Sequence, residues 1–235
     1  LVNQAAKLRY MLGGQLSIPL VVRTPGGGGV QYGPTHSQVL EAWFMQVPGL
    51  KVACPSDPAD AKGLLKAAIR DDNPVLFEEH KGLYRAPALR EVLPDEDYVV
   101  PLGKARTVRE GKDLTIVTYG AMVHKSVEAA ETLSDEGVSV EVIDLRTLLP
   151  MDEEAIIDSV KRTGKLLVVH EDTRTGGIAG EIAMRVSEQA FEWLDGPMLR
   201  VTAIDAPVPY SGSLEDYFLP QTDDVLKAAR YLAGY

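Results

Sequence analysis

Three observations predict an α/β fold made of two modules with parallel strands. Short apolar runs alternate with amphipathic segments along the 235 residues, as they do where helices join parallel strands. A polar, proline-bearing stretch from Tyr84 to Asp97 interrupts this alternation, which restarts at Leu114. A hydrophobic content of 45% supplies the apolar material for a core. We therefore expect one module over residues 1–95 and a second over residues 96–235.

The first module is predicted to begin with an amphipathic helix that ends at Gly13 and Gly14. This helix has no capping residue before Leu1, so we expect that an N-terminal portion is missing or was removed by processing. A further helix from Pro58 has Ser56 or Asp57 as its cap and proline near its first position. The other predicted elements are a strand at 16–23, a flexible loop at 24–29, a helix at 36–47, and strands at 50–53 and 75–78.

The second module is predicted to be a doubly wound domain of four strands with intervening helices. Glycines end two of the helices, at Gly137 and Gly164, and Thr222 is the predicted cap of the last one. The predicted strands are 114–118, 138–144, 165–170 and 199–204, and the predicted helices are 121–136, 152–162, 180–194 and 222–232.

Charge and cysteine content exclude several classes of protein. Lysine and arginine number 24 against 34 aspartates and glutamates, which gives a net charge of −10 and disfavours binding to nucleic acid or anionic lipid. The lone Cys54 forms no internal disulfide, and no Cys/His cluster has zinc-ligand spacing. The apolar run Ile18–Val22 is far short of the roughly 20 residues of a membrane span. A reducing compartment, the cytoplasm, is favoured.

Polar residues that follow the predicted strands are the first candidates for a site, because ligands of open α/β sheets bind beyond the carboxyl ends of the strands. These positions are Arg23 with the adjacent glycine loop, Ser56, Glu78 to Lys81, Tyr119 and Gly120, Asp144 to Arg146, His170 to Asp172, and Asp205. The glycine run 26–29 lacks the Lys-Ser/Thr of a phosphate-binding P-loop, and no serine lies in a G-x-S-x-G elbow. These two absences disfavour a nucleotide-binding P-loop and a serine hydrolase.

Two further features of the sequence each have two possible interpretations. His36 follows the glycine-rich loop where a helix is predicted to begin, so it is either a proton donor and acceptor in a cleft or a histidine hydrogen-bonded at a helix start. The stretch Asp71 to Pro74 ends a predicted helix and is either a nest of oxygens for a cation or an ordinary Asn-Pro turn.

Six short sequence motifs, taken in order along the chain, resemble those of a known family. The resemblance covers essentially all 235 residues. The motifs are Gly33-Pro-Thr-His-Ser-Gln38, Pro48-Gly-Leu-Lys-Val52, Asp60-Ala-Lys-Gly-Leu-Leu65, Ala68-Ile-Arg-Asp-Asp-Asn-Pro-Val75, Glu79-His-Lys-Gly-Leu-Tyr84, and Asp144-Leu-Arg-Thr-Leu148 with Pro150. The chain resembles the beta subunits of thiamine-diphosphate-dependent 2-oxoacid dehydrogenases, the group that acts on pyruvate, branched-chain 2-oxoacids or acetoin. The resemblance implies the C-terminal half of a pyrimidine-binding domain over residues 1–95. A transketolase C-terminal-like doubly wound domain would follow over residues 96–235.

The resemblance also implies an activity, cofactors and partners. The reaction is oxidative decarboxylation of a 2-oxoacid with acyl transfer to lipoyl-lysine, and thiamine diphosphate lies between this chain and an alpha subunit that holds its magnesium. His36 would steady the intermediate and assist reductive acylation of lipoate. A potassium site of mostly backbone oxygens would comprise Leu20, Ala68, Ile69, Asp71 and Asn73. The expected partners are the alpha subunit in an alpha2-beta2 heterotetramer, a dihydrolipoyl acyltransferase core and a second beta subunit.

One departure from the family pattern bears on activity. The family's catalytic glutamate, which bonds the aminopyrimidine ring, lies in a part of the domain that precedes Leu1, and Glu41, Glu78 and Glu79 occupy other motif positions. We therefore expect the isolated 235-residue chain to be inactive and the first sheet to have an unpaired edge. The alternatives are an acetoin dehydrogenase beta subunit, another transketolase relative and a non-catalytic docking or assembly fragment. The expected location is the cytoplasm, or the mitochondrial matrix in a eukaryote.

Overall fold

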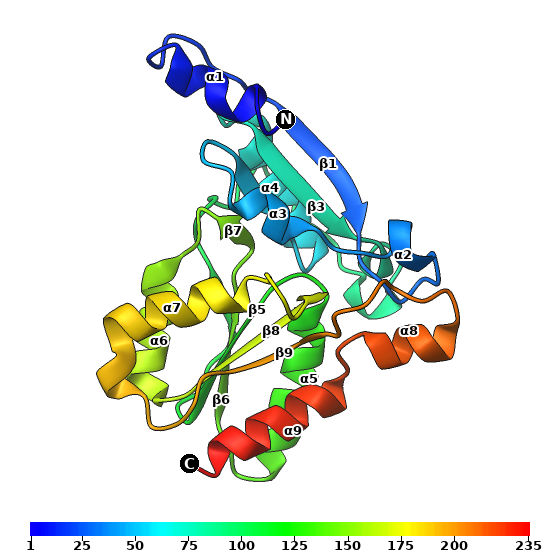
Figure 1. The fold of residues 1–235 in the computed structure, drawn as a ribbon, viewed down its shortest axis with the longest axis vertical. Coiled ribbons are helices and arrows are strands. Elements are labelled where there is room, and N and C mark those ends of the chain that lie inside the picture. The colour runs from blue at the N-terminus through cyan, green and yellow to red at the C-terminus, as the bar shows by residue number, and fades with distance from the viewer.

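A computed structural model describes all 235 residues. They form two β-sheets with helices packed against them, and one sheet lies above the other in Figure 1. The strands are β1 (Val21–Gly26), β2 (Lys51–Ala53), β3 (Val75–His80), β4 (Arg106–Arg109), β5 (Leu114–Thr118), β6 (Val140–Asp144), β7 (Thr147–Leu149), β8 (Leu166–Thr173) and β9 (Leu199–Ala203). The α-helices are α1 (Ala5–Met11), α2 (Gly33–His36), α3 (Glu41–Met45), α4 (Pro58–Ile69), α5 (Met122–Asp135), α6 (Glu153–Thr163), α7 (Ala179–Ala190), α8 (Gly212–Phe218) and α9 (Thr222–Ala233). The α/β class predicted from the alternating pattern is confirmed.

The first sheet has the strand order β1-β3-β2-β7, and its last strand comes from the second module. Strands β1, β3 and β2 are parallel, whereas β7 pairs antiparallel with β2 through Val52 and Leu149. Strand β1 lies at the edge and pairs only with β3, in agreement with the predicted unpaired edge. Because β2 bonds to both β3 and β7, residues on both sides of the 84–97 stretch build one sheet.

The second sheet has five strands in the order β4-β6-β5-β8-β9, with helices on both faces (Figure 1). Strand β5 is buried along its whole length, and its side chains alternate between two cores. Val117 packs with α6 and α7 on one face, and Ile116 packs with α5 and α9 on the other. Burial on both faces explains the three apolar residues of β5, and the hydroxyl of its buried Thr115 is hydrogen-bonded to Ser159 and Thr163 of α6.

Several predicted boundaries were wrong, and two short strands and one short helix were missed. The strand predicted at 16–23 begins at Val21, because the amide of Leu20 bonds back to the carbonyl of Ile18 at 2.7 Å instead of to a neighbouring strand. The helix predicted at 36–47 is divided into α2 and α3, and the helix predicted at 180–194 ends at Ala190 before a 3₁₀ turn. Strands β4 and β7 and helix α8 were not predicted, so the second sheet has five strands rather than four.

Local capping explains where the longer helices begin and end. The Asp57 carboxylate accepts the amide of Asp60 at 2.7 Å and caps α4, as one of the two predicted alternatives. Helix α6 ends at Gly164 in the left-handed conformation, with φ of 68°. The predicted cap Thr222 is wrong, since Gln221 caps α9 through a reciprocal pair of bonds with Asp224.

An ionic cluster joins α4 of the first module to the start of the second sheet. The Arg146 guanidinium binds the Asp60 carboxylate through two nitrogens, at 2.9 and 3.0 Å, and Arg106 binds Asp57 at 2.6 Å. Asp144, which is fully buried, accepts the Ser56 hydroxyl at 2.5 Å. Buried charges require such partners, because an unpaired charge in the interior is strongly destabilising. These paired charges therefore favour one particular packing of the first module against the second.

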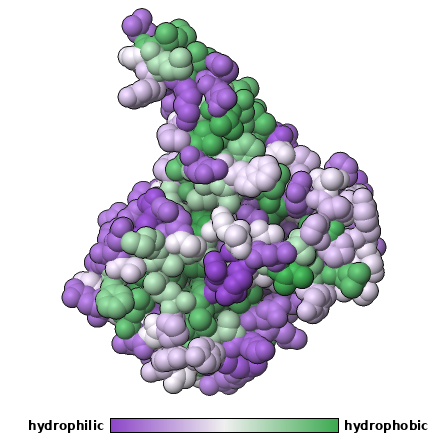
Figure 2. All heavy atoms as spheres, viewed as in Figure 1, coloured by the Kyte–Doolittle hydropathy of each residue, from purple (hydrophilic) through white to green (hydrophobic).

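Helix α1 and the segment after it extend away from the rest of the molecule (Figure 1). Large apolar side chains of this region are solvent-exposed, among them Tyr10, Met11, Leu16 and Leu20. Figure 2 shows apolar surface at the upper part of the molecule, along this extension and β1. None of the helices is both long enough and apolar enough to cross a bilayer.

Candidate functional site

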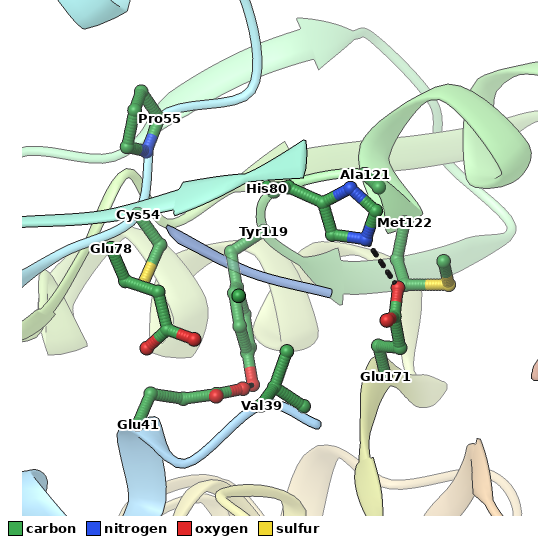
Figure 3. Close-up of a pocket in the computed structure, with 12 residues that line it drawn as sticks. Val39, Glu41, Cys54, Pro55, Glu78, His80, Tyr119, Ala121, Met122 and Glu171 are labelled. Carbon is green, nitrogen blue, oxygen red and sulfur yellow. Dashed lines mark hydrogen bonds and ion pairs between the residues drawn. The ribbon is translucent and has the colours of Figure 1, made fainter. Parts of the chain in front are cut away.

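Polar residues from both modules meet where β3, β5 and β8 end, as the strand-end rule predicts (Figure 3). Glu78 and His80 come from β3, Tyr119 follows β5, and Glu171 lies on β8. Glu41, on the first turn of α3, completes the group. These side chains enclose a small cavity of about 30 Å³, which is room for about one water molecule. We call these five residues the interface cluster.

Glu41 and Tyr119 form a buried pair in this cluster. The Tyr119 hydroxyl donates to Glu41 Oε1, whereas Glu41 Oε2 has no hydrogen-bond partner (Figure 3). Burial raises the pKa of Glu41 well above its ordinary value, and repulsion from Glu78 and Asp172 adds to this effect. Burial likewise raises the pKa of Tyr119. Glu41 is thus a buried carboxyl group whose proton is held more tightly than in an exposed glutamate, and it does not line the larger open hollow nearby.

Glu78 is a largely buried member of the cluster whose pKa lies near neutral pH. Burial, together with repulsion from Asp172, raises the pKa of Glu78 to about 7. Glu78 also lines a second, larger hollow on its other side, so it separates two cavities. Cys54 borders the cluster as well, and burial raises the pKa of its thiol well above the ordinary value. The thiol is therefore held in its unreactive, protonated form.

Glu171 is a charged anchor at the other end of the cluster. Its Oε2 accepts a hydrogen bond from His80 Nε2 at 2.7 Å, and its Oε1 accepts the amide of Gly28 at 2.6 Å. His80 Nδ1 accepts the amide of Gly82 at 3.2 Å, which assigns the ring proton to Nε2. Burial acts to raise the pKa of Glu171, but His80, the Gly28 amide and Lys125 outweigh it and hold that pKa below its ordinary value.

His36 lies at the end of α2, exposed to solvent, on the rim of an open hollow of about 840 Å³. Apolar groups of Pro25 and Phe44 and the polar side chains of Glu78 and Lys81 also line this hollow. The Lys81 ammonium donates to the backbone carbonyl of His36, and burial lowers the pKa of Lys81. The imidazole of His36 has no hydrogen-bond partner, so both ring nitrogens are available to a bound molecule.

The glycine-rich loop before His36 is in contact with other side chains, and residues 24–26, which were predicted as loop, belong to a strand. Its first residues extend β1 to Gly26, which pairs with His80 of β3. Side chains occupy the space beside the glycines: a Cβ on Gly27 would lie 2.2 Å from the His80 ring, and one on Gly33 would lie 2.2 Å from the Tyr210 ring. Both glycines have positive φ, at 86° and 72°, which other residues rarely adopt.

The five residues predicted to hold potassium lie together in the structure. Ala68 and Ile69 end α4, Asp71 and Asn73 form the turn after it, and the amide of Val75 donates to the carbonyl of Leu20 at 2.8 Å. The Asp71 carboxylate already has partners, because Asp71 Oδ2 is paired with Lys51 and Asp71 Oδ1 accepts from Asn73. The residues fit a monovalent cation only through their carbonyl oxygens, which are the ligands that potassium filters use.

Other strand-end candidates are separate from this site. Arg23 pairs with Glu79 at 2.6 Å, and Asp205 bonds Thr175. His170 is the last residue of the strand predicted at 165–170, but β8 continues to Thr173, so His170 is fully buried within it and burial lowers its pKa to about 4. Sequence reasoning missed Asp60, Arg106 and Glu215. Of these three residues, only Asp60 had a local signal in the sequence, because it lies three residues after the helix cap Asp57.

Both halves of the chain match family models with related descriptions. Residues 1–87 match the model "Transketolase, pyrimidine binding domain", and residues 103–225 match "Transketolase, C-terminal domain". A solved structure titled "Split gene transketolase, inactive beta4 tetramer" superimposes with a TM-score of 0.75 at 24% identity, over 98% of this chain and 73% of that one. The fold is therefore that of the pyrimidine-binding and C-terminal domains of transketolase-like enzymes.

Sequence similarity to curated proteins identifies a narrower family within this fold class. The 2-oxoisovalerate dehydrogenase subunit beta of Bacillus subtilis is 48% identical over 100% of this chain and 72% of its own length. Pyruvate dehydrogenase E1 component subunit beta of the same species is 47% identical, over 97% of this chain and 69% of its own. Acetoin:2,6-dichlorophenolindophenol oxidoreductase subunit beta of Cupriavidus necator is 47% identical, over 97% and 67%. The chain belongs to the family of 2-oxoacid and acetoin dehydrogenase beta subunits, and the resemblance seen in its motifs is confirmed.

Proposed function

We propose that this chain acts in the decarboxylating component of a 2-oxoacid dehydrogenase complex, as its beta subunit. The observation that carries the proposal is the position of His36 on the rim of an open hollow, next to a rigidly held glycine-rich loop. An imidazole without a hydrogen-bond partner there has both ring nitrogens available to donate or accept a proton on a bound intermediate. We divide the chain at about residue 95 into a pyrimidine-binding and a transketolase-like C-terminal domain.

The cofactor of this proposal is thiamine diphosphate, which supplies an electron sink for the carbanion left by decarboxylation. The residues present fit one wall of its site: the hollow beside His36 is large, partly apolar and open to a partner chain. Two of the three nearby carboxylates already have side-chain partners, since Glu79 is paired with Arg23 and Glu41 is bonded to Tyr119. Glu78 lines the hollow but is largely buried. In the proposal, an alpha subunit holds the diphosphate with magnesium, and His36 holds or moves a proton at the substrate end.

The proposal includes the assembly and its location. The alpha subunit completes an alpha2-beta2 heterotetramer in which beta subunits also contact each other, and a dihydrolipoyl acyltransferase core receives the acyl group. The location is the cytoplasm, or the mitochondrial matrix in a eukaryote. Acetoin is a second candidate substrate, because a relative that is 47% identical is named as an acetoin oxidoreductase subunit.

Reconstitution of the beta subunit with its alpha subunit tests this function. With thiamine diphosphate and magnesium, we expect reduction of an artificial electron acceptor with pyruvate or a branched-chain 2-oxoacid, and acylation of a lipoyl domain. His36→Gln is expected to lower lipoyl acylation about 100-fold, since a positioned acid or base contributes about that factor. The isolated 235-residue chain is expected to show no turnover.

The contrary outcomes are distinct. Turnover of acetoin alone would replace the 2-oxoacid assignment by the acetoin assignment. Binding of the alpha subunit and the acyltransferase without any turnover would support a docking role and contradict the enzymatic one. An unchanged rate of lipoyl acylation for His36→Gln would show that His36 takes no part in the reaction.

We further propose that potassium binds the carbonyl oxygens of Leu20, Ala68, Ile69, Asp71 and Asn73. Potassium chloride is expected to raise the melting temperature of the chain above that in choline chloride of equal ionic strength, because a ligand that binds only the folded state stabilises it. Asn73→Ala should remove this difference, since it frees the Asp71 carboxylate from one of its bonds and loosens the turn. Equal melting temperatures in the two salts would contradict the site.

A further inference from the structure

The glycine-rich loop before His36 is held by two carboxylates of the second module. Glu171 Oε1 accepts the amide of Gly28 at 2.6 Å, and Glu215 Oε2 accepts the amide of Gln31 at 2.9 Å. Both glutamates are at least nine-tenths buried, Glu171 with 7% and Glu215 with 1% of the residue exposed. Hydrogen bonds to a buried carboxylate are among the stronger ones in proteins.

The loop has little freedom to relax away from these anchors. Gln31 has a φ of 59°, in the left-handed region that non-glycine residues seldom adopt, so its position depends on the bond to Glu215. A Cβ on Gly28 would lie 2.9 Å from Leu219 Cδ2 and 3.4 Å from Glu215 Oε1. Loop and second module are thus packed against each other without a gap.

Glu171 is also connected to His36 by a second route, through the turn that follows β3. It accepts a hydrogen bond from His80 (Figure 3), and the second ring nitrogen of His80 accepts the amide of Gly82. The intervening residue, Lys81, donates through its ammonium group to the backbone carbonyl of His36. A single carboxylate therefore fixes both the loop that precedes His36 and the turn that contacts the His36 backbone.

We propose that Glu171, with Glu215 as a second anchor, is a positioning residue that sets the place of the His36 imidazole for the reaction. This inference rests on the proposed function. A displacement of about 1 Å of a reacting group is able to cost on the order of 100-fold in rate, so a residue that touches no substrate still controls turnover. The second module would in this way act on the site through the glycine-rich loop.

The variant Glu171→Gln keeps the shape of the side chain but replaces one acceptor by an amide donor. That donor must face either the Gly28 amide or the His80 Nε2 proton, so one of the two bonds is lost. We expect amide hydrogen exchange across residues 26–36 to become about ten-fold faster. In the reconstituted complex we expect about ten-fold slower lipoyl acylation, with the KM for the 2-oxoacid changed less than about two-fold. Glu215→Gln should speed exchange around Gln31.

A double-mutant cycle separates positioning from a general structural role. If Glu171 acts through His36, then Glu171→Gln adds no loss to His36→Gln, whereas independent effects multiply. Glu188→Gln, on the exposed surface of α7 and without a hydrogen-bond partner, is the matched control and should change neither exchange nor rate.

Two results would overturn the proposal: unchanged exchange at residues 26–36 in both Glu171→Gln and Glu215→Gln, or losses that multiply in the cycle. If the wild-type complex turns over no substrate, the proposed function fails, and with it the link to catalysis. The exchange experiment needs neither cofactor nor activity, so it still decides whether the two glutamates anchor the loop.

Discussion

Replacing Arg146 by methionine is expected to lower the free energy of unfolding of the 235-residue chain by about 3 kcal/mol. Arg146 binds Asp60 through two nitrogens, and only 2% of the Asp60 side chain is exposed. Without Arg146, the buried carboxylate keeps only Arg106, at 3.2 Å, as a close cation. Removing one partner of a buried ion pair is costly because the other charge stays buried without compensation. Urea unfolding followed by tryptophan fluorescence measures the loss.

Two tryptophans make this experiment more informative, since Trp43 lies on α3 of the first module and Trp193 follows α7 in the second. A single transition whose midpoint falls without a change of slope indicates that both modules still unfold together. The control is Arg185→Met, whose partners Glu153 and Glu181 are on the surface, and it should cost less than about 1 kcal/mol. Equal losses for the two variants would show that the ionic cluster contributes nothing specific.

Glu78→Gln is expected to stabilise the chain progressively as the pH rises from about 4.5 to about 7. The pKa of Glu78 is about 7 in the folded protein, against an ordinary value of 4.5, because the carboxyl is buried near Asp172. Between these values the folded state holds a proton that the unfolded state has released, so wild-type stability falls as the pH rises. Glutamine has no proton to lose and avoids this decline. The gain reaches about 3 kcal/mol above pH 7 and vanishes below pH 4.5.

Thermal or urea unfolding of both proteins at a series of pH values provides the test. The informative quantity is the difference between variant and wild type, because His170 contributes an opposite slope. Burial lowers the pKa of His170 to about 4, so stability from this group is lost as the pH falls from 6.5 toward 4. His170 is present in both proteins and cancels in the difference. A difference that does not change with pH would show that Glu78 titrates in the folded state as it does in the unfolded chain.

Much of the fold was predictable because the strands and helices of the second module have strong local signals. Strand β5 was predicted over its observed residues, Leu114–Thr118, and Asp57 was one of two predicted caps. Strand β7 was missed because its three residues gain their strand character from pairing with β2, about 95 positions earlier. The division of residues 36–47 was missed for a similar reason: Glu41 is placed by Tyr119, which no local pattern reveals.

The site was predicted in part. The rule that ligands bind beyond strand ends pointed to Glu78, His80, Tyr119 and Glu171, and the structure brings all four together. His36 was found by its place after the glycine-rich loop. Glu215 was not found, because it lies on a short helix that meets the glycine-rich loop only in the folded chain, and its hydrogen-bond partner Gln31 is 184 positions away. Charge pairs across such sequence distances depend on how the two modules pack.

The pairing of β7 with β2 has a consequence for synthesis of the protein on the ribosome. Strand β2 and its neighbours emerge early, but the strand that completes their sheet is not made until residue 149. Until then β2 has an open edge, the kind of edge that recruits other chains. The first module therefore cannot reach its final structure while it is being translated, and a gene truncated near residue 95 should yield a product that aggregates.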